Sequence, residues 1–212
     1  MSSLTDRIAS FFSGNDSNTD EGLRDLFITE VKGIYYAEKQ IVDALGDQAQ
    51  ASTTNEVKAA FLQHQDESKR HVERLEELFR ILDIQTEERP SDAVDGLISE
   101  ARFVISDTEA ESLTRDAALI IAAQKIEHYE IAVYGSLLTL ADVLGFSQSA
   151  ELLAQTLEEE KSTDHKLTAL AKAFVNVRSK EEEDNHPGSH HASRHHTHGT
   201  GSDVTLGGPL GV

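Results

Sequence analysis

Residues 84–108, with the sequence IQTEERPSDAVDGLISEARFVISDT, decide the fold because they interrupt an otherwise strongly helical pattern. Pro90 breaks the chain, since proline cannot continue a helix. After it, apolar spacing predicts one short helix, formed by Val94, Leu97, Ile98 and Ala101. This connection of about 25 residues is long, because helix–helix loops usually have roughly 2–8 residues. We therefore expect a crossover between the helices on either side.

Four longer amphipathic segments flank this connection, two before it and two after it. Their apolar residues recur at steps of three and four, the spacing that places them on one face of a helix. Only a short turn separates the two segments of each pair. Two helix hairpins joined by one long crossover predict an all-α, ferritin-like four-helix bundle. The expected helices cover residues 20–45, 53–83, 108–145 and 147–177.

Capping signals predict where these helices begin and end. Thr53 with Glu56, and Thr108 with Glu111, have the spacing of a capping box. In this motif a Thr and a Glu side chain bond to backbone N–H groups of the first helical turn. Gly46 is expected to end the first helix, because glycine readily adopts the left-handed conformation that follows many helices.

The two ends of the chain differ in composition from its central part. Residues 1–19 are either a docking segment or a frayed terminus, and four of their apolar residues would share one helical face: Leu4, Ile8, Phe11 and Phe12. Residues 179–212 are acidic at first and then rich in His, Gly, Ser and Thr, which favours disorder. Weak metal buffering and no function are both open for this tail. We expect an N-terminal arm (1–19), the bundle (20–178) and a disordered His-rich tail (179–212).

The charge balance and the lack of cysteine exclude several classes of protein. The chain has 38 Asp and Glu residues against 19 Lys and Arg residues, a formal net charge of −19, which repels nucleic acid and anionic lipid surfaces. Without cysteine it has no disulfide, no thiolate metal site and no cysteine nucleophile. No apolar run approaches the roughly 20 residues that span a bilayer. We expect a soluble, cytoplasmic protein that binds neither nucleic acid nor membrane.

Carboxylates and imidazoles fall on the apolar faces of all four predicted helices when successive residues are placed 100° apart. Residue counts from the turns bring seven of them into one layer about 9 Å deep. Glu30 and His71 fall below this layer, and we expect them either to support it or to form a satisfied polar pair. The seven residues of the layer are Glu38, His64, Glu67, Glu127, Glu130, Glu160 and Asp164.

These side chains need positive charge beside them, because an ionised carboxylate buried without a partner costs several kcal/mol. No Lys or Arg lies near the centre of the four helix faces, and Arg74 comes nearest, at an edge. Divalent cations would supply the charge, and oxygen and imidazole ligands suit iron or manganese. We therefore predict a pair of iron or manganese ions, at which O2 or peroxide is reduced by two electrons. The Glu-x-x-His order usual for such sites is missing, since the helices read His64-x-x-Glu67 and Glu127-x-x-Glu130.

Four segments resemble the YciE/YciF family of ferritin-like stress proteins. They are LRDLFITEVKGIYYAEKQIVDAL (23–45), FLQHQDESKRHVERLEELF (61–79), KIEHYEIAVYGSL (125–137) and TLEEEKSTDHKLTALA (156–171). The resemblance covers residues 20–175 and implies a ferritin-like bundle with a di-iron site, ferroxidase activity, a role in bacterial stress and a homodimer. By the matching motifs, it implies the same ligands as the layer: Glu38, His64, Glu67, Glu127, Glu130, Glu160 and Asp164.

Three functional interpretations remain open. The first is an oxidoreductase of the oxidative or general stress response, a di-metal ferroxidase or peroxide-consuming protein. The second is a stress protein that sequesters iron or manganese without turnover. The third is a structural or interaction bundle whose polar layer only fixes the register of the helices.

Overall fold

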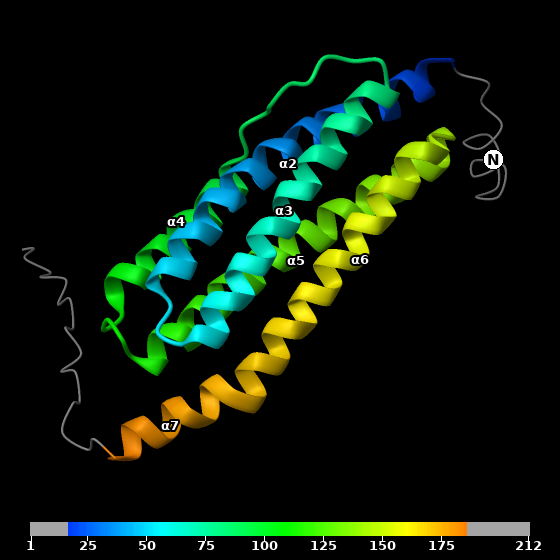
Figure 1. The fold of residues 1–212 in the computed structure, drawn as a ribbon. Coiled ribbons are helices and arrows are strands. Elements are labelled where there is room, and N and C mark those ends of the chain that lie inside the picture. Colours follow the sequence, from blue (N-terminus) through cyan, green and yellow to red (C-terminus); the bar gives the residue numbers. More distant parts are fainter. Residues whose placement is uncertain (1–16, 186–212) are drawn as a thin grey trace, which may run out of the picture.

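The structure is a computed structural model that describes residues 17–185. Within this range the chain forms helices and no strand. Two long hairpins, α2/α3 and α5/α6, pack together, and α4 lies in the connection between them (Figure 1). This confirms the predicted four-helix bundle with a crossover. The helices are α2 (Ser17–Ala51), α3 (Asn55–Ile81), α4 (Asp92–Asp107), α5 (Leu113–Leu144), α6 (Ser147–Leu170) and α7 (Asn176–Asn185), with a π-helical segment, η1 (Ala171–Val175), between the last two.

The crossover is held against the bundle along its length. The backbone N–H of Arg89 donates to the carbonyl of Lys32 on α2 at 3.1 Å. Helix α4 then packs on α2 and α5 through a buried apolar face that includes Val94 and Ile98. The short helix that the sequence predicts is therefore present. It has 16 residues, and packing of its apolar face on two neighbouring helices stabilises it.

Helix α2 does not end at Gly46, as the sequence predicts, but continues to Ala51. The reason is that Gln48 and Ala49, which follow Gly46, are still buried in the bundle; at Gly46 itself α2 packs closely against α3. A Cβ atom at position 46 would lie 2.9 Å from Nε2 of Gln65, and that amide donates to the carbonyl of Val42 at 2.8 Å. Gly46 is thus a point of close approach between two helices, where a side chain would not fit without a shift.

Two helices begin at different capping residues from those predicted. Thr54, and not Thr53, caps α3 by accepting from the N–H of Val57. Ser112 caps α5, four residues beyond Thr108. Buried Asp116 on α5 explains the first shift, because its carboxylate accepts from the N–H groups of Thr53 and Thr54 at 2.7 and 2.9 Å. A contact between helices distant in sequence thus decides which threonine caps α3.

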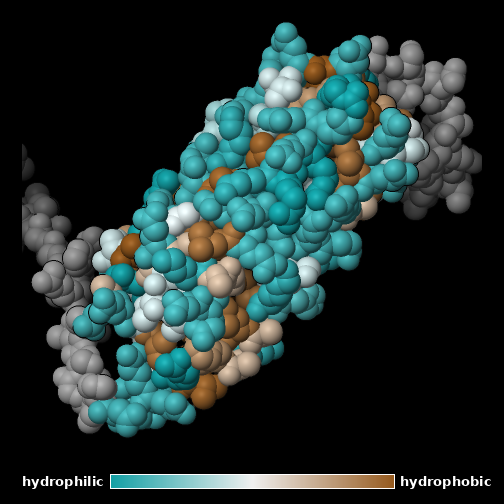
Figure 2. All heavy atoms as spheres, viewed as in Figure 1, coloured by the Kyte–Doolittle hydropathy of each residue, from teal (hydrophilic) through white to brown (hydrophobic). Residues whose placement is uncertain are grey.

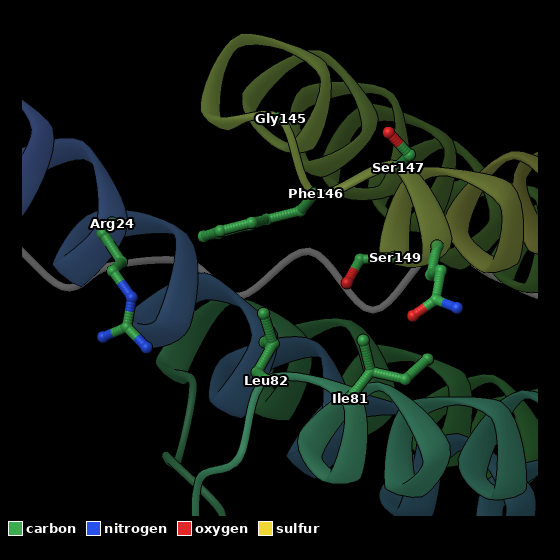
Figure 3. A pocket seen from close by; sticks show the side chains of 8 residues that line it. Arg24, Ile81, Leu82, Gly145, Phe146, Ser147 and Ser149 are labelled. Atoms are coloured by element: carbon green, nitrogen blue, oxygen red, sulfur yellow. The ribbon is translucent and has the colours of Figure 1, made fainter.

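The turn between α5 and α6 closes one end of the bundle. Gly145 adopts the left-handed conformation with φ of 72°, and the helix boundaries on both sides agree with the sequence prediction. Phe146 points from this turn toward α2 (Figure 3), where its ring centroid lies 5.6 Å from that of Phe27. A pocket of about 360 Å³ remains beside it, with Arg24 and Leu82 among its lining residues.

The last helix extends beyond residue 178, where the sequence predicts the bundle to end and a disordered tail to begin. Helix α7 runs to Asn185, and Ser179 is buried with its hydroxyl 3.2 Å from that of Thr114. A carboxylate oxygen of Glu182 accepts from the N–H of Leu113 at 3.1 Å, which satisfies a donor at the start of α5. The six tail histidines, from 186 onward, and the apolar residues of the arm lie outside the described residues.

The outer surface is mostly hydrophilic, as the teal spheres of Figure 2 show for one face. Apolar side chains fill the space between the helices, with Phe27, Ile41 and Phe61 fully buried. No helix in residues 17–185 is both long and apolar enough to cross a membrane. The distinctive feature of this bundle is a group of charged residues at the centre of the apolar core.

Candidate metal centre

Six titratable side chains from the four long helices meet inside the bundle, and we call them the inner cluster. Each of them is at most 2% exposed. Residues seven apart on α3 and three apart on α5 lie on one helical face, which explains how two helices contribute two residues each. The inner cluster consists of Glu38 (α2), His64 and His71 (α3), Glu127 and Glu130 (α5), and Glu160 (α6).

The first half of the inner cluster is built around His64. Its Nδ1 lies 3.0 Å from Oε1 of Glu127, and its Nε2 lies 3.5 Å from Oε2 of Glu160. With Glu130 these residues each offer one ligand atom, and the four atoms lie within 4.8 Å of one another. Both oxygens of Glu130 are buried without a hydrogen-bond partner. Converging donors whose lone pairs are unused fit a metal ion, because a cation would satisfy them together.

The second half is built around His71, and it shares a carboxylate with the first. Nδ1 of His71 lies 2.7 Å from Oε1 of Glu160 and 3.2 Å from Oε1 of Glu38. The three residues again offer ligand atoms within 4.8 Å of one another. One oxygen of Glu160 faces each half, which is the arrangement of a carboxylate able to bridge two cations.

No lysine or arginine among residues 17–185 neutralises these carboxylates. Among the described residues, no Lys or Arg forms an ion pair with Glu38, Glu127, Glu130 or Glu160, and the nitrogen atoms near them belong to the two histidines. Oxygen and imidazole donors without thiolate fit iron or manganese. The donor set could therefore hold a metal ion, and iron or manganese stays a prediction.

Burial controls the protonation of the two carboxyls on α5. Loss of hydration raises the pKa of Glu127 well above its usual value, and the nearby carboxyl of Glu160 raises it further. The pKa of Glu130 is raised well above its usual value by the same two causes. Without a cation, both carboxyls therefore hold their protons to a higher pH than a carboxyl in water does.

Glu160 and His71 favour their charged forms, the carboxylate and the imidazolium. Burial alone would raise the pKa of Glu160, but hydrogen bonds and charge from His64 and His71 hold it below its usual value. Burial also opposes a charge on His71, yet Glu38 and Glu160 raise the pKa of this imidazole from 6.5 to about 10. A cation that binds here must displace the proton of His71 as well as those of the two neutral carboxyls.

A chain of contacts connects His71 to the surface. Nε2 of His71 lies 2.9 Å from a carboxylate oxygen of Glu159, which is partly exposed. Arg74 holds that carboxylate by two hydrogen bonds of 2.9 Å. On the other side, the hydroxyl of buried Tyr134 donates to Glu38 at 2.6 Å. Such outer contacts fix the orientation of side chains that bind metals.

Glu67 and Asp164, two of the seven predicted ligands, lie outside the inner cluster. Glu67 accepts from the hydroxyl of Thr163 at 3.1 Å, and its side chain is 13% exposed. Asp164 accepts from the amide of Gln124 at 3.1 Å, and its side chain is 18% exposed. The other five predicted ligands, Glu38, His64, Glu127, Glu130 and Glu160, are brought together.

His71 is a functional candidate that the sequence prediction placed below the layer. The inner cluster extends along the bundle axis, because His64 and His71 are two helical turns apart and both contact Glu160. Their seven-residue spacing is the signal that would have found His71, since it keeps both imidazoles on one face. Glu30 lies apart from the inner cluster, in a groove between α2 and α5.

A family model described as a domain of unknown function, DUF892, matches residues 22–180. Protein YciF of Escherichia coli is 44% identical over 158 residues, which cover 74% of this chain and 95% of that protein. The matched range contains the whole inner cluster.

Solved structures with a similar fold include the same relative and two other bacterial proteins. The crystal structure of the E. coli stress protein YciF matches with a TM-score of 0.69 and 45% identity, over 73% of this chain and 97% of that chain. YcfI of Rhodopseudomonas palustris matches with a TM-score of 0.67 and 34% identity, over 69% and 92%. A protein of Xanthomonas campestris, at 19% identity and a TM-score of 0.63 over 76% and 99%, shares the fold.

Proposed function

The chain belongs to the DUF892 family, and from this premise we propose that it binds two iron or manganese ions in the inner cluster and acts as a ferroxidase or peroxide-consuming protein in the stress response. The proposed role in the stress response rests on the similarity to YciF, which is described as a stress protein. Its location in the cytoplasm and its assembly as a homodimer belong to the same proposal.

One observation carries the proposal. Two groups of converging ligand atoms share Glu160, in a core where no described Lys or Arg neutralises them. A purely structural polar layer would use its hydrogen-bonding capacity internally, because unsatisfied buried groups cost free energy. Here Glu130 leaves both of its oxygens without a partner. This pattern supports a layer that is completed by cations.

The residues have distinct parts in the proposed activity. Glu160 would hold both ions, with His64, Glu127 and Glu130 on one side and Glu38 and His71 on the other. Two adjacent iron ions can supply two electrons to O2 or peroxide. The surrounding core excludes bulk water, and Glu159 together with Arg74 keeps the His71 ring in place.

The test is the metal content of the purified full chain after anaerobic loading with Fe(II) and removal of loosely bound metal. We compare the native chain with a Glu127→Gln/Glu130→Gln variant. Both contain the His-rich tail, so any metal bound by the tail cancels in the difference between them. The expected difference is about one ion per chain or more, because both substituted residues would hold the ion on the His64 side of Glu160. A Glu67→Gln/Asp164→Asn variant is the matched control and also tests whether these two residues are ligands. Equal metal content in the native chain and the Glu127/Glu130 variant would contradict the proposal.

Metal sequestration without turnover is the second candidate function, and the complete burial of the inner cluster favours it. Glu38, Glu127, Glu130 and Glu160 are all 0% exposed, which restricts the access of a second substrate. The rate of Fe(II) oxidation in air separates the two functions. A ferroxidase oxidises Fe(II) faster than the Glu127→Gln/Glu130→Gln variant does, whereas a sequestering protein binds the ions with no such difference in rate.

A further inference from the structure

The pocket beside Phe146 offers hydrogen-bond donors and no carboxylate. It lies at the end of the bundle that the α5/α6 turn closes, and its volume is about 360 Å³ (Figure 3). Arg24 of α2 and residues 147–149 of α6 line it, together with apolar side chains. None of its eight described lining residues is Asp or Glu, although the chain has a formal net charge of −19. An anion that enters this pocket therefore meets no like charge in the lining.

Helix α6 begins without a capping side chain. Phe146 occupies the position before its first residue, and no side chain bonds to its first turn. The N–H of Ala150 donates to the carbonyl of Phe146 at 2.9 Å, so the three N–H groups before it, of residues 147–149, have no acceptor inside the helix. Helices α3 and α5 each have a capping hydroxyl and an acid in the first turn, and α6 has neither. The partial positive charge at the start of α6 is therefore not offset by its own first turn.

Ser149 adds a second and independent observation, a buried donor without a partner. The residue is 0% exposed, and its hydroxyl oxygen forms no hydrogen bond with the rest of the described chain. Figure 3 shows this hydroxyl directed into the pocket, toward the end of α3 where Leu82 lies, whereas the hydroxyl of Ser147 points away. A buried polar group without a partner costs free energy. An acceptor atom of a bound ligand would satisfy it.

We propose that this pocket binds a small molecule that carries a phosphate group on an apolar body. The phosphate oxygens accept from the free N–H groups of residues 147–149 and from the hydroxyl of Ser149, since helix N-termini readily bind phosphate. Arg24, on the α2 side of the pocket (Figure 3), supplies a positive charge. A phosphate fits better than a carboxylate because it presents three acceptor oxygens to donors on two helices. The apolar body lies against Phe146 and Leu82.

This pocket is separate from the inner cluster. None of its described lining residues belongs to that cluster. Ser149 precedes Glu160 by eleven residues on α6, which is about 16 Å along the helix at about 1.5 Å per residue. The proposal therefore does not rest on metal binding, and substitutions in the pocket leave the candidate metal ligands in place.

Titration calorimetry with phenyl phosphate tests the proposal in the full chain. Metal is first removed by chelation and dialysis, so that phosphate cannot bind through a bound cation. Inorganic phosphate, which has no apolar body, is titrated alongside. Arg24→Gln and Ser149→Ala each remove one of the proposed donors. The matched controls are Arg70→Gln on α3 and Ser162→Ala on α6, both at exposed positions.

We expect phenyl phosphate to bind saturably at a single site. Arg24→Gln and Ser149→Ala should each raise its dissociation constant about tenfold, because each removes a hydrogen bond to a charged group, and the two controls should not change it. Inorganic phosphate should bind about fivefold more weakly, since it makes no contact with Phe146 and Leu82.

Thermal melting without ligand separates lost binding from lost folding. Ser149→Ala should melt no lower than the native chain, because it removes a hydroxyl that has no partner. The absence of saturable binding overturns the proposal. So does an unchanged dissociation constant in either Arg24→Gln or Ser149→Ala. Equal affinities for phenyl phosphate and inorganic phosphate also overturn it, because the apolar wall would then take no part in binding.

Discussion

Glu130→Leu is expected to stabilise the protein without metal and to reduce the stabilisation that metal provides. Glu130 is 0% exposed, and both of its oxygens lack a partner. Leucine has a similar volume and no polar group to leave unsatisfied. A buried polar group left without a hydrogen-bond partner costs about 1–3 kcal/mol of stability. We therefore expect the metal-free variant to melt at a higher temperature than the metal-free native chain.

Bound metal acts in the opposite direction. At a free concentration 100 times the dissociation constant, each bound ion adds about 2.7 kcal/mol to the free energy of unfolding, so two ions add about 5 kcal/mol. In a domain of this size each kcal/mol raises the melting temperature by roughly 2–4 °C. The native chain should gain roughly 10–20 °C from the two ions, and the variant, which lacks one of the donors around His64, should lose roughly half of that gain.

Thermal melting followed by circular dichroism, in EDTA and in excess Mn(II), measures both effects. Mn(II) avoids oxidation during the experiment. Glu158→Leu is the matched control, because Glu158 is on the surface of α6 with a side chain that is 73% exposed. If Glu130→Leu melts below the native chain in EDTA, the buried carboxyl is not a liability. If it keeps the full Mn(II) shift, Glu130 is not a ligand. Either result refutes the reasoning.

Three further predictions follow from the same contacts. The metal-free protein should lose stability as the pH rises from about 7 to 10. The pKa of His71 is raised from 6.5 to about 10, so the protonated imidazole stabilises the fold and this stabilisation is lost when the proton leaves. Melting curves across this range check the sign of the change. Glu159→Gln and Arg74→Met should each weaken Mn(II) binding about tenfold in equilibrium dialysis, since both loosen the orientation of His71; affinities within twofold of the native value would contradict this role. Asp116→Ala should lower the free energy of unfolding by about 3 kcal/mol in urea, because it leaves partly buried N–H and hydroxyl donors without an acceptor. An unchanged midpoint would show that water replaces the carboxylate.

The fold could be predicted from the sequence because its signals are local. The length of the 84–108 connection and the apolar spacing of the four helices depend on residues close together in the chain. The helix boundaries were less predictable, since they depend on distant partners. Helix α2 continues past Gly46 because Gln48 and Ala49 are buried against the other helices, and Thr54 caps α3 beside Asp116. Neither contact can be read from the spacing of nearby residues.

The candidate site divides in the same way. The spacing of residues on one helix identifies the side chains that face the bundle axis, and this selected Glu38, Glu127 and Glu160 from sequence alone. It does not say how far along an inward-facing arc a side chain lies. Glu67 and Asp164 instead contact Thr163 and Gln124 between helices, with side chains that are 13% and 18% exposed. Helix spacing therefore predicts which residues face the inside of the bundle, but it does not predict which of them reach the inner cluster.

The charge of the inner cluster shows why two divalent cations are the simplest completion of this core. Four carboxylates, when all are ionised, carry four negative charges, and two divalent cations balance them with both imidazoles neutral and free to act as ligands. Without cations the negative charge is reduced differently, because burial raises the pKa of Glu127 and Glu130, and the carboxylates of Glu38 and Glu160 raise the pKa of His71 against the effect of its burial. The protein with cations and the protein without them therefore differ in the protons on these side chains, and cation binding would displace those protons. A core selected solely for stability would have no need of the second state, since leucine would fill the space of Glu130 without its hydration cost.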